Sequence, residues 1–122
     1  MKSGHYKLAK QIGRHGFFAE VAVNYYRVDD GPRITVADSV PPAVHRKLGA
    51  AAITGVKYAL EHCDCSADFA ATGITITEII EQPVDTTTES VQFAASHATW
   101  IATGRAPTKE PKFNDGRIVF ED

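Results

Sequence analysis

The sequence predicts an α+β fold, a two-layer sandwich in which a small mixed or antiparallel sheet carries two helices on one face. Residues 72–80 are rich in Ile and Thr, the β-branched composition of a strand. Residues 42–60 and residues 91–102 each place apolar or small side chains at helical spacing. With no internal repeat or linker, the 122 residues are expected to form one domain, residues 1–122.

The first part of the chain predicts a turn and a hairpin. Residues 1–16 are polar and basic, and residues 13–16 (Gly-Arg-His-Gly) are typical of a flexible turn. Apolar and polar residues alternate over residues 17–28, which predicts a strand. The turn signal Asp-Asp-Gly-Pro follows at residues 29–32, so residues 33–38 are expected to return as an antiparallel partner strand.

Pro41 and Pro42 are expected to open the first helix, because a proline in the first turn loses no intrahelical hydrogen bond. The apolar stripe of this helix has small residues in its middle, which favours close packing against a sheet. The stripe consists of Val44, Leu48, Ala51, Ala52, Gly55, Ala59 and Leu60. A loop at residues 63–68 and a strand at residues 69–80 should follow.

Thr86 and Glu89 have the spacing of a capping box, which predicts the start of the second helix. Gly104 is predicted to end this helix. An exposed turn containing Pro83 separates the strand from the helix. At the C-terminus, residues 112–121 surround the turn signal Asn-Asp-Gly and predict a terminal strand or short hairpin on the sheet edge.

Composition narrows the class of protein. The net charge of −2 gives no global attraction to nucleic acid or to an anionic membrane. No apolar run approaches the roughly 18 residues that a membrane-spanning helix needs. Residues 1–7 lack the apolar core of a signal peptide. We therefore expect a cytoplasmic protein without a membrane partner.

The two cysteines raise the question of a metal site. Cys63 and Cys65 are too close in sequence for an unstrained disulfide. Together with His62 they offer three soft ligands, but no second Cys/His pair supplies a fourth. We therefore prefer a helix end that runs into a loop, with one cysteine tucked beneath it, and expect no metal.

Catalytic residues are not expected either. No serine or cysteine nucleophile has a partner histidine at a recognisable spacing, and His45 and His97 are expected at a helix surface or half-buried. A group of carboxylates around one turn is interpreted as solvated charge rather than an acid/base pair: Glu78, Glu81, Asp85 and Glu89. No cofactor is expected.

Residues 10–21 read Lys-Gln-Ile-Gly-Arg-His-Gly-Phe-Phe-Ala-Glu-Val, and residues 55–60 read Gly-Val-Lys-Tyr-Ala-Leu. Residues 74–77 read Ile-Thr-Ile-Thr, and residues 84–86 read Val-Asp-Thr ahead of Gln-Phe-Ala. In this order, these segments resemble domain IV of translation elongation factor G. Residues 42–46 (Pro-Ala-Val-His-Arg) are also similar to the ribosome-protecting tetracycline-resistance factors of that family.

The resemblance extends over about residues 7–112, in order. It implies the left-handed βαβ crossover that this domain shares with a small-subunit ribosomal protein and the ribonuclease P protein. Because most crossovers are right-handed, this expectation comes from the resemblance alone. In the family, the domain is the arm that reaches into the ribosomal decoding region, with two loops at its tip.

When the two tip loops of the family are carried over to this sequence, the resemblance implies that two turns of this chain meet at one end of the domain and contact the ribosome or structured RNA. The first loop contains Gly13, Arg14, His15 and Gly16, with Lys10 before it; the second contains Glu81, Gln82, Pro83, Val84 and Asp85. Glycines permit close backbone approach, and arginine and glutamine can bind phosphate and base. Taken alone, the first loop fits a flexible turn equally well, and Asp85 and Thr86 fit helix capping.

Departures from the family limit what the resemblance implies. Arg14 replaces the second glycine, Gln82 replaces a tip histidine, and Glu81 adds negative charge. The chain has no Gly-x-x-x-x-Gly-Lys-Ser/Thr phosphate loop, so it is expected to be a free-standing relative of the arm or a fragment.

Two functions remain open from the sequence. The first is RNA or ribosome binding through a basic patch at Lys7, Lys10, Arg14 and His15. The second is a protein–protein interaction or homo-oligomerisation module that keeps the fold without RNA binding.

Overall fold

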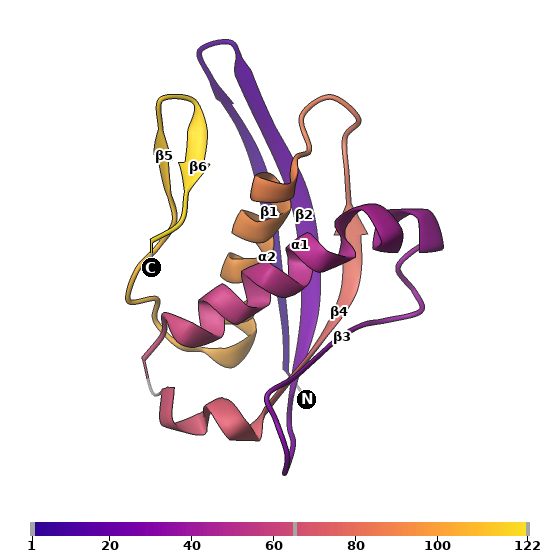
Figure 1. Ribbon diagram of the computed structural model, residues 1–122, viewed down its shortest axis with the longest axis vertical. Coiled ribbons are helices and arrows are strands. Elements are labelled where there is room, and N and C mark those ends of the chain that lie inside the picture. The colour runs from indigo at the N-terminus through magenta and orange to yellow at the C-terminus, as the bar shows by residue number, and fades with distance from the viewer. Residues whose placement is uncertain (1, 65, 122) are drawn as a thin grey trace.

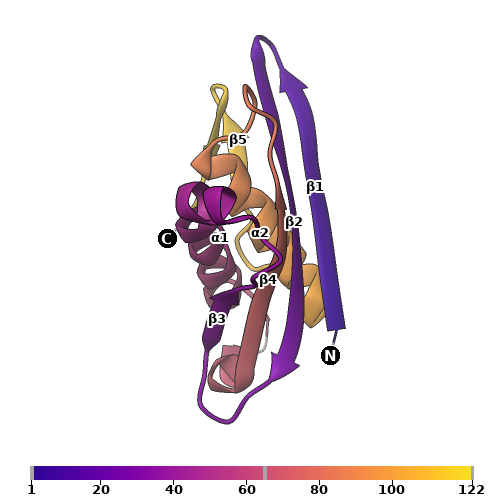
Figure 2. The ribbon, with the colours of Figure 1, turned by 90° about the vertical axis from the view of Figure 1, so that its right-hand side faces the viewer.

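In the computed structural model, which describes residues 2–64 and 66–121, two helices cover one face of a four-stranded sheet (Figure 1). Figure 2 shows the sheet and the helices edge-on as two layers. The chain runs through β1 (Lys2–Ile12), β2 (His15–Arg27), β3 (Arg33–Val36), α1 (Pro42–Glu61), the 3₁₀ helix η1 (Ser66–Ala71), β4 (Thr72–Ile80), α2 (Thr88–Thr103), β5 (Lys112–Asn114) and β6 (Arg117–Val119). The predicted α+β sandwich is confirmed.

The sheet is mixed, with strand order β1-β2-β4-β3. β1 and β4 each pair with β2 in antiparallel orientation, while β3 pairs with β4 in parallel. α1 connects the two parallel strands. In Figure 1, both strands point upward, α1 lies in front of the sheet, and β4 lies to the left of β3, so the crossover is left-handed.

The predicted hairpin of residues 17–28 with residues 33–38 is wrong. β2 pairs instead with β1, from Lys2 opposite Tyr25 to Ile12 opposite His15. β1 was not predicted, because lysines at an edge strand make it look like a polar tail. Its inward side nevertheless buries Gly4 and Leu8.

Small residues let α1 lie close to α2, rather than to the sheet as predicted. A Cβ added at Gly55 would clash with the carbonyl oxygen of Gln92 and lie 2.9 Å from the Cβ of Ala95. The Ser96 hydroxyl donates to the Gly55 carbonyl at 2.9 Å, and the Trp100 indole donates to the Ala59 carbonyl at 3.0 Å. The helix pair therefore packs backbone to backbone.

The ends of the second helix only partly match the sequence prediction. Gly104 ends α2 in the left-handed conformation, with φ of 68°, as predicted. The capping box, however, uses Thr87 and Ser90 rather than Thr86 and Glu89. Ser90 is fully buried, and its hydroxyl accepts a hydrogen bond from the Thr87 amide. A short side chain fits this buried position, whereas a longer carboxylate side chain would have to be accommodated inside the core.

β5 and β6 form the predicted terminal hairpin, but they do not extend the main sheet. The hairpin instead packs against the sandwich, with Ile118 and Phe113 joining Phe17 and Phe93 in an apolar cluster. Within residues 2–64 and 66–121, no helix has the length and apolarity needed to cross a lipid bilayer.

Candidate nucleic-acid interface

The first predicted loop is shorter than expected. Ile12 and His15 still pair as strand residues, which leaves Gly13 and Arg14 as the turn. Gly13 has a positive φ of 60°. The tight two-residue turns of β-hairpins require a positive φ at this position, and glycine adopts it with little strain. His15 and Gly16 belong to β2, which corrects the prediction that residues 13–16 are a flexible turn. Arg14 is exposed at the tip.

Backbone and hydroxyl contacts hold the second loop against β2. The Phe18 amide donates to the Asp85 carbonyl at 3.0 Å. The Thr86 hydroxyl donates to the Phe18 carbonyl at 2.7 Å and accepts from the Gln82 amide at 2.8 Å. Thr86 therefore joins this loop to β2 rather than capping α2, and both predicted tip loops lie at one end of the sheet (Figure 1).

Gly16 makes room for the side chain of Asp85. A Cβ at Gly16 would lie 2.6 Å from the Asp85 carboxylate, whose exposure is intermediate. This contact joins one residue from each predicted loop. It is possible because glycine has no side chain to occupy the space.

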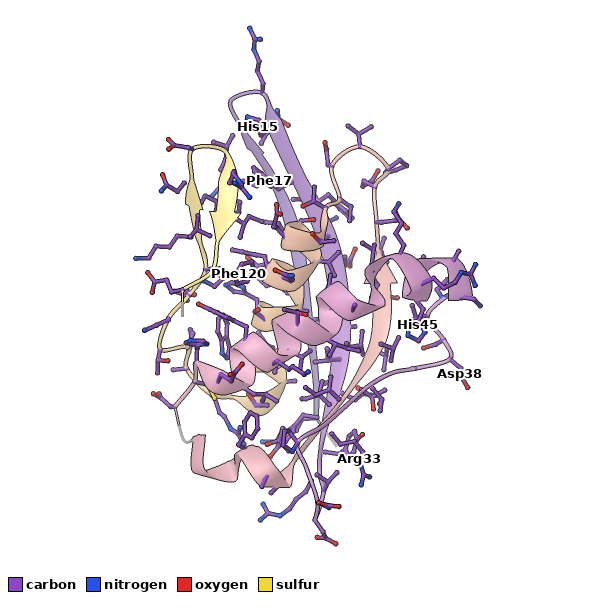
Figure 3. All side chains as sticks on the ribbon, viewed as in Figure 1. His15, Phe17, Arg33, Asp38, His45 and Phe120 are labelled. Atoms are coloured by element: carbon purple, nitrogen blue, oxygen red, sulfur yellow. The ribbon has the colours of Figure 1, made fainter. Side chains whose placement is uncertain are left out.

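A third segment at this end was missed by the sequence analysis. The turn of the β5–β6 hairpin reaches the same end of the molecule, and a Cβ at Gly116 would lie 2.6 Å from the His15 ring. The rings of Phe17 and Phe113 are 5.1 Å apart, edge to face. Figure 3 shows His15 and Phe17 on the side of β2 that faces this hairpin. The Asn-Asp-Gly turn signal located the hairpin but not its position beside His15.

The negative charge of Glu81 is paired. Lys47, near the start of α1, donates to the Glu81 carboxylate at 2.9 Å. No sequence signal connected these two residues. The pair is exposed enough that its effect on stability is small, but it offsets a carboxylate charge at the tip.

The predicted basic patch is divided between two sides of the β1–β2 hairpin. Lys10 lies over the ring of Phe113, 4.5 Å from its centre, on the helix side. Lys7 lies on the open side of the sheet, 5.9 Å from the centre of the Phe18 ring. Arg14 is exposed at the turn that joins the two strands. The cations therefore surround the hairpin rather than forming one surface.

A shallow groove of about 330 Å³ lies between the two predicted loops. Amide, ammonium, carboxylate and phenyl groups line it, supplied by Ala9, Lys10, Gln11, Phe17, Phe18, Gln82 and Asp85. Beside the groove, the Val84 side chain is 91% exposed, an apolar group presented to solvent at the tip. The groove can accept hydrogen-bonding and planar groups.

The other candidate residues occupy structural positions. Cys63 is buried beneath the end of α1, as predicted, and the His62 ring stacks on Tyr58 with ring centres 4.2 Å apart. Cys65, the remaining member of the possible zinc motif, lies outside the described residues. His97 is half-buried, as expected, and its Nε2 is 3.5 Å from Glu110. His45 is exposed on α1.

Tyr6 on β1 packs next to His97, with ring centres 4.6 Å apart. Burial, with a smaller contribution from the carboxylate of Glu110, raises the pKa of the Tyr6 phenol above its ordinary value of 10.0. The phenol therefore stays neutral at physiological pH and serves the packing of β1 on α2.

The comparisons with known proteins inform the fold alone. No protein-family model matches the chain, and the search of curated proteins gives no match. Among solved structures, the chain is similar to a crystal structure of a protein from Thermus thermophilus, with a TM-score of 0.63 and 19% sequence identity. The likeness covers 87% of this chain and 16% of the other, so this chain spans a small part of that protein's length.

Proposed function

We propose that this chain is a translation-factor-like binding module that associates with the ribosome or structured RNA through its tip. One observation carries the proposal: hydrogen bonds from Asp85 and Thr86 hold the second loop against β2 at Phe18, next to the first loop, whose Gly16 makes room for the Asp85 side chain. A cytoplasmic location and a non-catalytic role are parts of the same proposal.

The chemistry of the tip supports an RNA partner. Arg14 is an exposed cation at the end of a hairpin, where a guanidinium can reach a phosphate without displacing other contacts. Gln11 and Gln82 line the groove with amides that can bind base edges or ribose hydroxyls. The resemblance of residues 10–21 and 84–86 to the tip of an elongation-factor domain adds to this support.

Co-sedimentation of the chain with ribosomes at increasing salt tests the proposal. We expect association at low salt that weakens as salt rises, because counterions are released when phosphates are neutralised. Arg14→Glu should weaken binding by about tenfold and reduce the slope of log K against log salt by about 1.

Arg33→Glu is the matched control, because it makes the same charge change on β3, away from the tip (Figure 3). It should leave binding within about twofold of the unmodified chain, because Arg33 pairs with Gly73 at the start of β4, at the opposite end of the strand from the tip (Figure 3), where an exposed charge is screened from the bound RNA. No association at low salt, or equal losses in both variants, would contradict the proposal.

A protein-interaction or homo-oligomerisation module remains the alternative, and one observation favours it. β1 is the outermost strand of the sheet, so one of its backbone edges has no strand partner among the residues that the structure describes. This edge could pair with a strand of another protein. Pairing of two identical β1 edges is disfavoured, because each carries the exposed Lys2, Lys7 and Lys10. Size-exclusion chromatography with light scattering over a range of concentrations distinguishes the two; a stable dimer would favour the alternative.

A further inference from the structure

Three side chains of the kinds that can bind a metal ion lie close together on the open face of the sheet, outside the proposed RNA interface. His5, Glu20 and Glu78 come from the neighbouring strands β1, β2 and β4. One ligand atom from each lies within 4.8 Å of the other two. Glu20 is half-buried, and the other two residues are exposed, so an ion could enter from solvent.

A β-bulge brings Glu78 to this face. Ala22 pairs with Glu78 but Val23 pairs with Ile76, so Thr77 is an extra residue in β4. Without it, alternation from Ile76 would direct Glu78 into the core. With it, Ile79 is buried and Glu78 lies outside, next to the other two side chains.

From this arrangement we infer that His5, Glu20 and Glu78 form a binding site for a divalent transition-metal ion, with Zn²⁺ the preferred occupant. One imidazole and two carboxylates are ligands that Zn²⁺ accepts, and three protein ligands leave a position for water. Ligand atoms around a tetrahedral Zn²⁺ lie about 3.4 Å apart, given bonds of about 2.1 Å. Side-chain rotation can adjust the three groups to that spacing, because His5 and Glu78 are exposed.

Two of the three side chains already contact each other. The Nε2 atom of His5 is 2.5 Å from the Glu20 carboxylate, and since a carboxylate only accepts, the ring nitrogen donates. An ion bound at Nε2 would take the place of this hydrogen bond, with the imidazole in the tautomer that carries its proton on Nδ1. Lys7 lies opposite Glu20 in the strand register and is the nearest cation on β1 that would compete with the ion for this carboxylate.

Calorimetric titration of Zn²⁺ into the full chain, pretreated with a chelator, tests this site. We expect a stoichiometry of one ion per chain. His5→Gln and Glu78→Gln should each weaken binding by at least about tenfold, the loss typical when a metal site is disturbed. Zn²⁺ should raise the melting temperature of the unmodified chain and not of these variants.

His45→Gln and Glu61→Gln are matched controls, since both replace exposed residues of α1, away from the sheet face; they should keep full affinity. The segment containing His62 and Cys63 could also bind Zn²⁺, so the Co²⁺ form provides a second readout. Absorption from thiolate-to-metal charge transfer, unchanged Zn²⁺ affinity in both site variants, or no binding to the unmodified chain would overturn the inference.

Discussion

The two faces of the sheet differ sharply although the same strands build both. On the covered face, β2 and β4 present Val21, Val23, Ile74 and Ile76, all completely buried under the helices. On the open face, alternate residues of these strands carry carboxylates, hydroxyls and amides. The covered face therefore provides the hydrophobic stabilisation, while the open face can change its chemistry at little cost to the fold.

The largest expected effect compares neighbours on β4. Ile76→Ala should lower the free energy of unfolding by about 4 kcal/mol, because it removes a fully buried side chain and leaves a cavity. Thr75→Ala, one residue away on the open face, should cost about 1 kcal/mol, because its hydroxyl contacts the hydroxyls of Thr35 and Tyr26. Urea denaturation of both variants measures the difference; comparable losses would contradict the contrast between the faces.

A second comparison concerns β1, whose inward side touches α2 without an intervening side chain. A Cβ at Gly4 would clash with the Ala98 carbonyl and lie 2.6 Å from the Ala102 amide nitrogen. Gly4→Ala should therefore destabilise the fold by about 2 kcal/mol, as overpacking does. Ser3→Ala, on the open face, is the control and should stay within about 0.5 kcal/mol in thermal denaturation.

A smaller effect is expected where the covered face meets the tip. The Ser90 hydroxyl accepts from the Thr87 amide at 2.8 Å and lies 3.1 Å from the Phe18 carbonyl. Ser90→Ala should cost about 1.5 kcal/mol, because it removes a helix cap inside the protein. Thr88→Ala removes an exposed hydroxyl from the same turn and should change stability by about 0.5 kcal/mol or less, measured by chemical denaturation.

The smallest effect depends on pH. Because the folded pKa of Tyr6 is raised above 10.0, the neutral phenol contributes stability that is fully present below about pH 10 and is lost as pH rises through the raised pKa. Tyr6→Phe should therefore show a weaker fall in melting temperature than the unmodified chain in alkaline buffers. Identical pH profiles for the two proteins would contradict a role for this ionisation.

Local signals in the sequence identified many of the elements and both candidate loops. Gly104 ends α2, and the Ile/Thr-rich segment forms β4, although β4 starts at Thr72 after a 3₁₀ helix rather than at residue 69. Such patterns depend only on residues within the same turn or strand, so the local sequence is enough to predict these elements. The cap at Thr87 was missed by one position, because neighbouring Thr-x-x-Glu and Thr-x-x-Ser patterns look alike until burial selects one.

The candidate site was only partly predictable. The two tip loops could be proposed from the resemblance, but no local pattern connects Lys47 with Glu81 or Gly116 with His15. The side of β4 that Glu78 occupies depends on a bulge opposite Ala22 and Val23. Each of these contacts joins segments that are distant in sequence, and their partners depend on strand register.

By itself, the sequence determined the two-layer α+β class, the two helices and the tight turns, because helical periodicity, β-branched strands, glycine and proline act through neighbouring residues. The tertiary structure decided that β1 pairs with β2, that β3 runs parallel to β4 and that the C-terminal hairpin lies beside the tip. Strand pairing between distant segments is selected by which arrangement buries the apolar faces together, and that choice involves the whole chain at once.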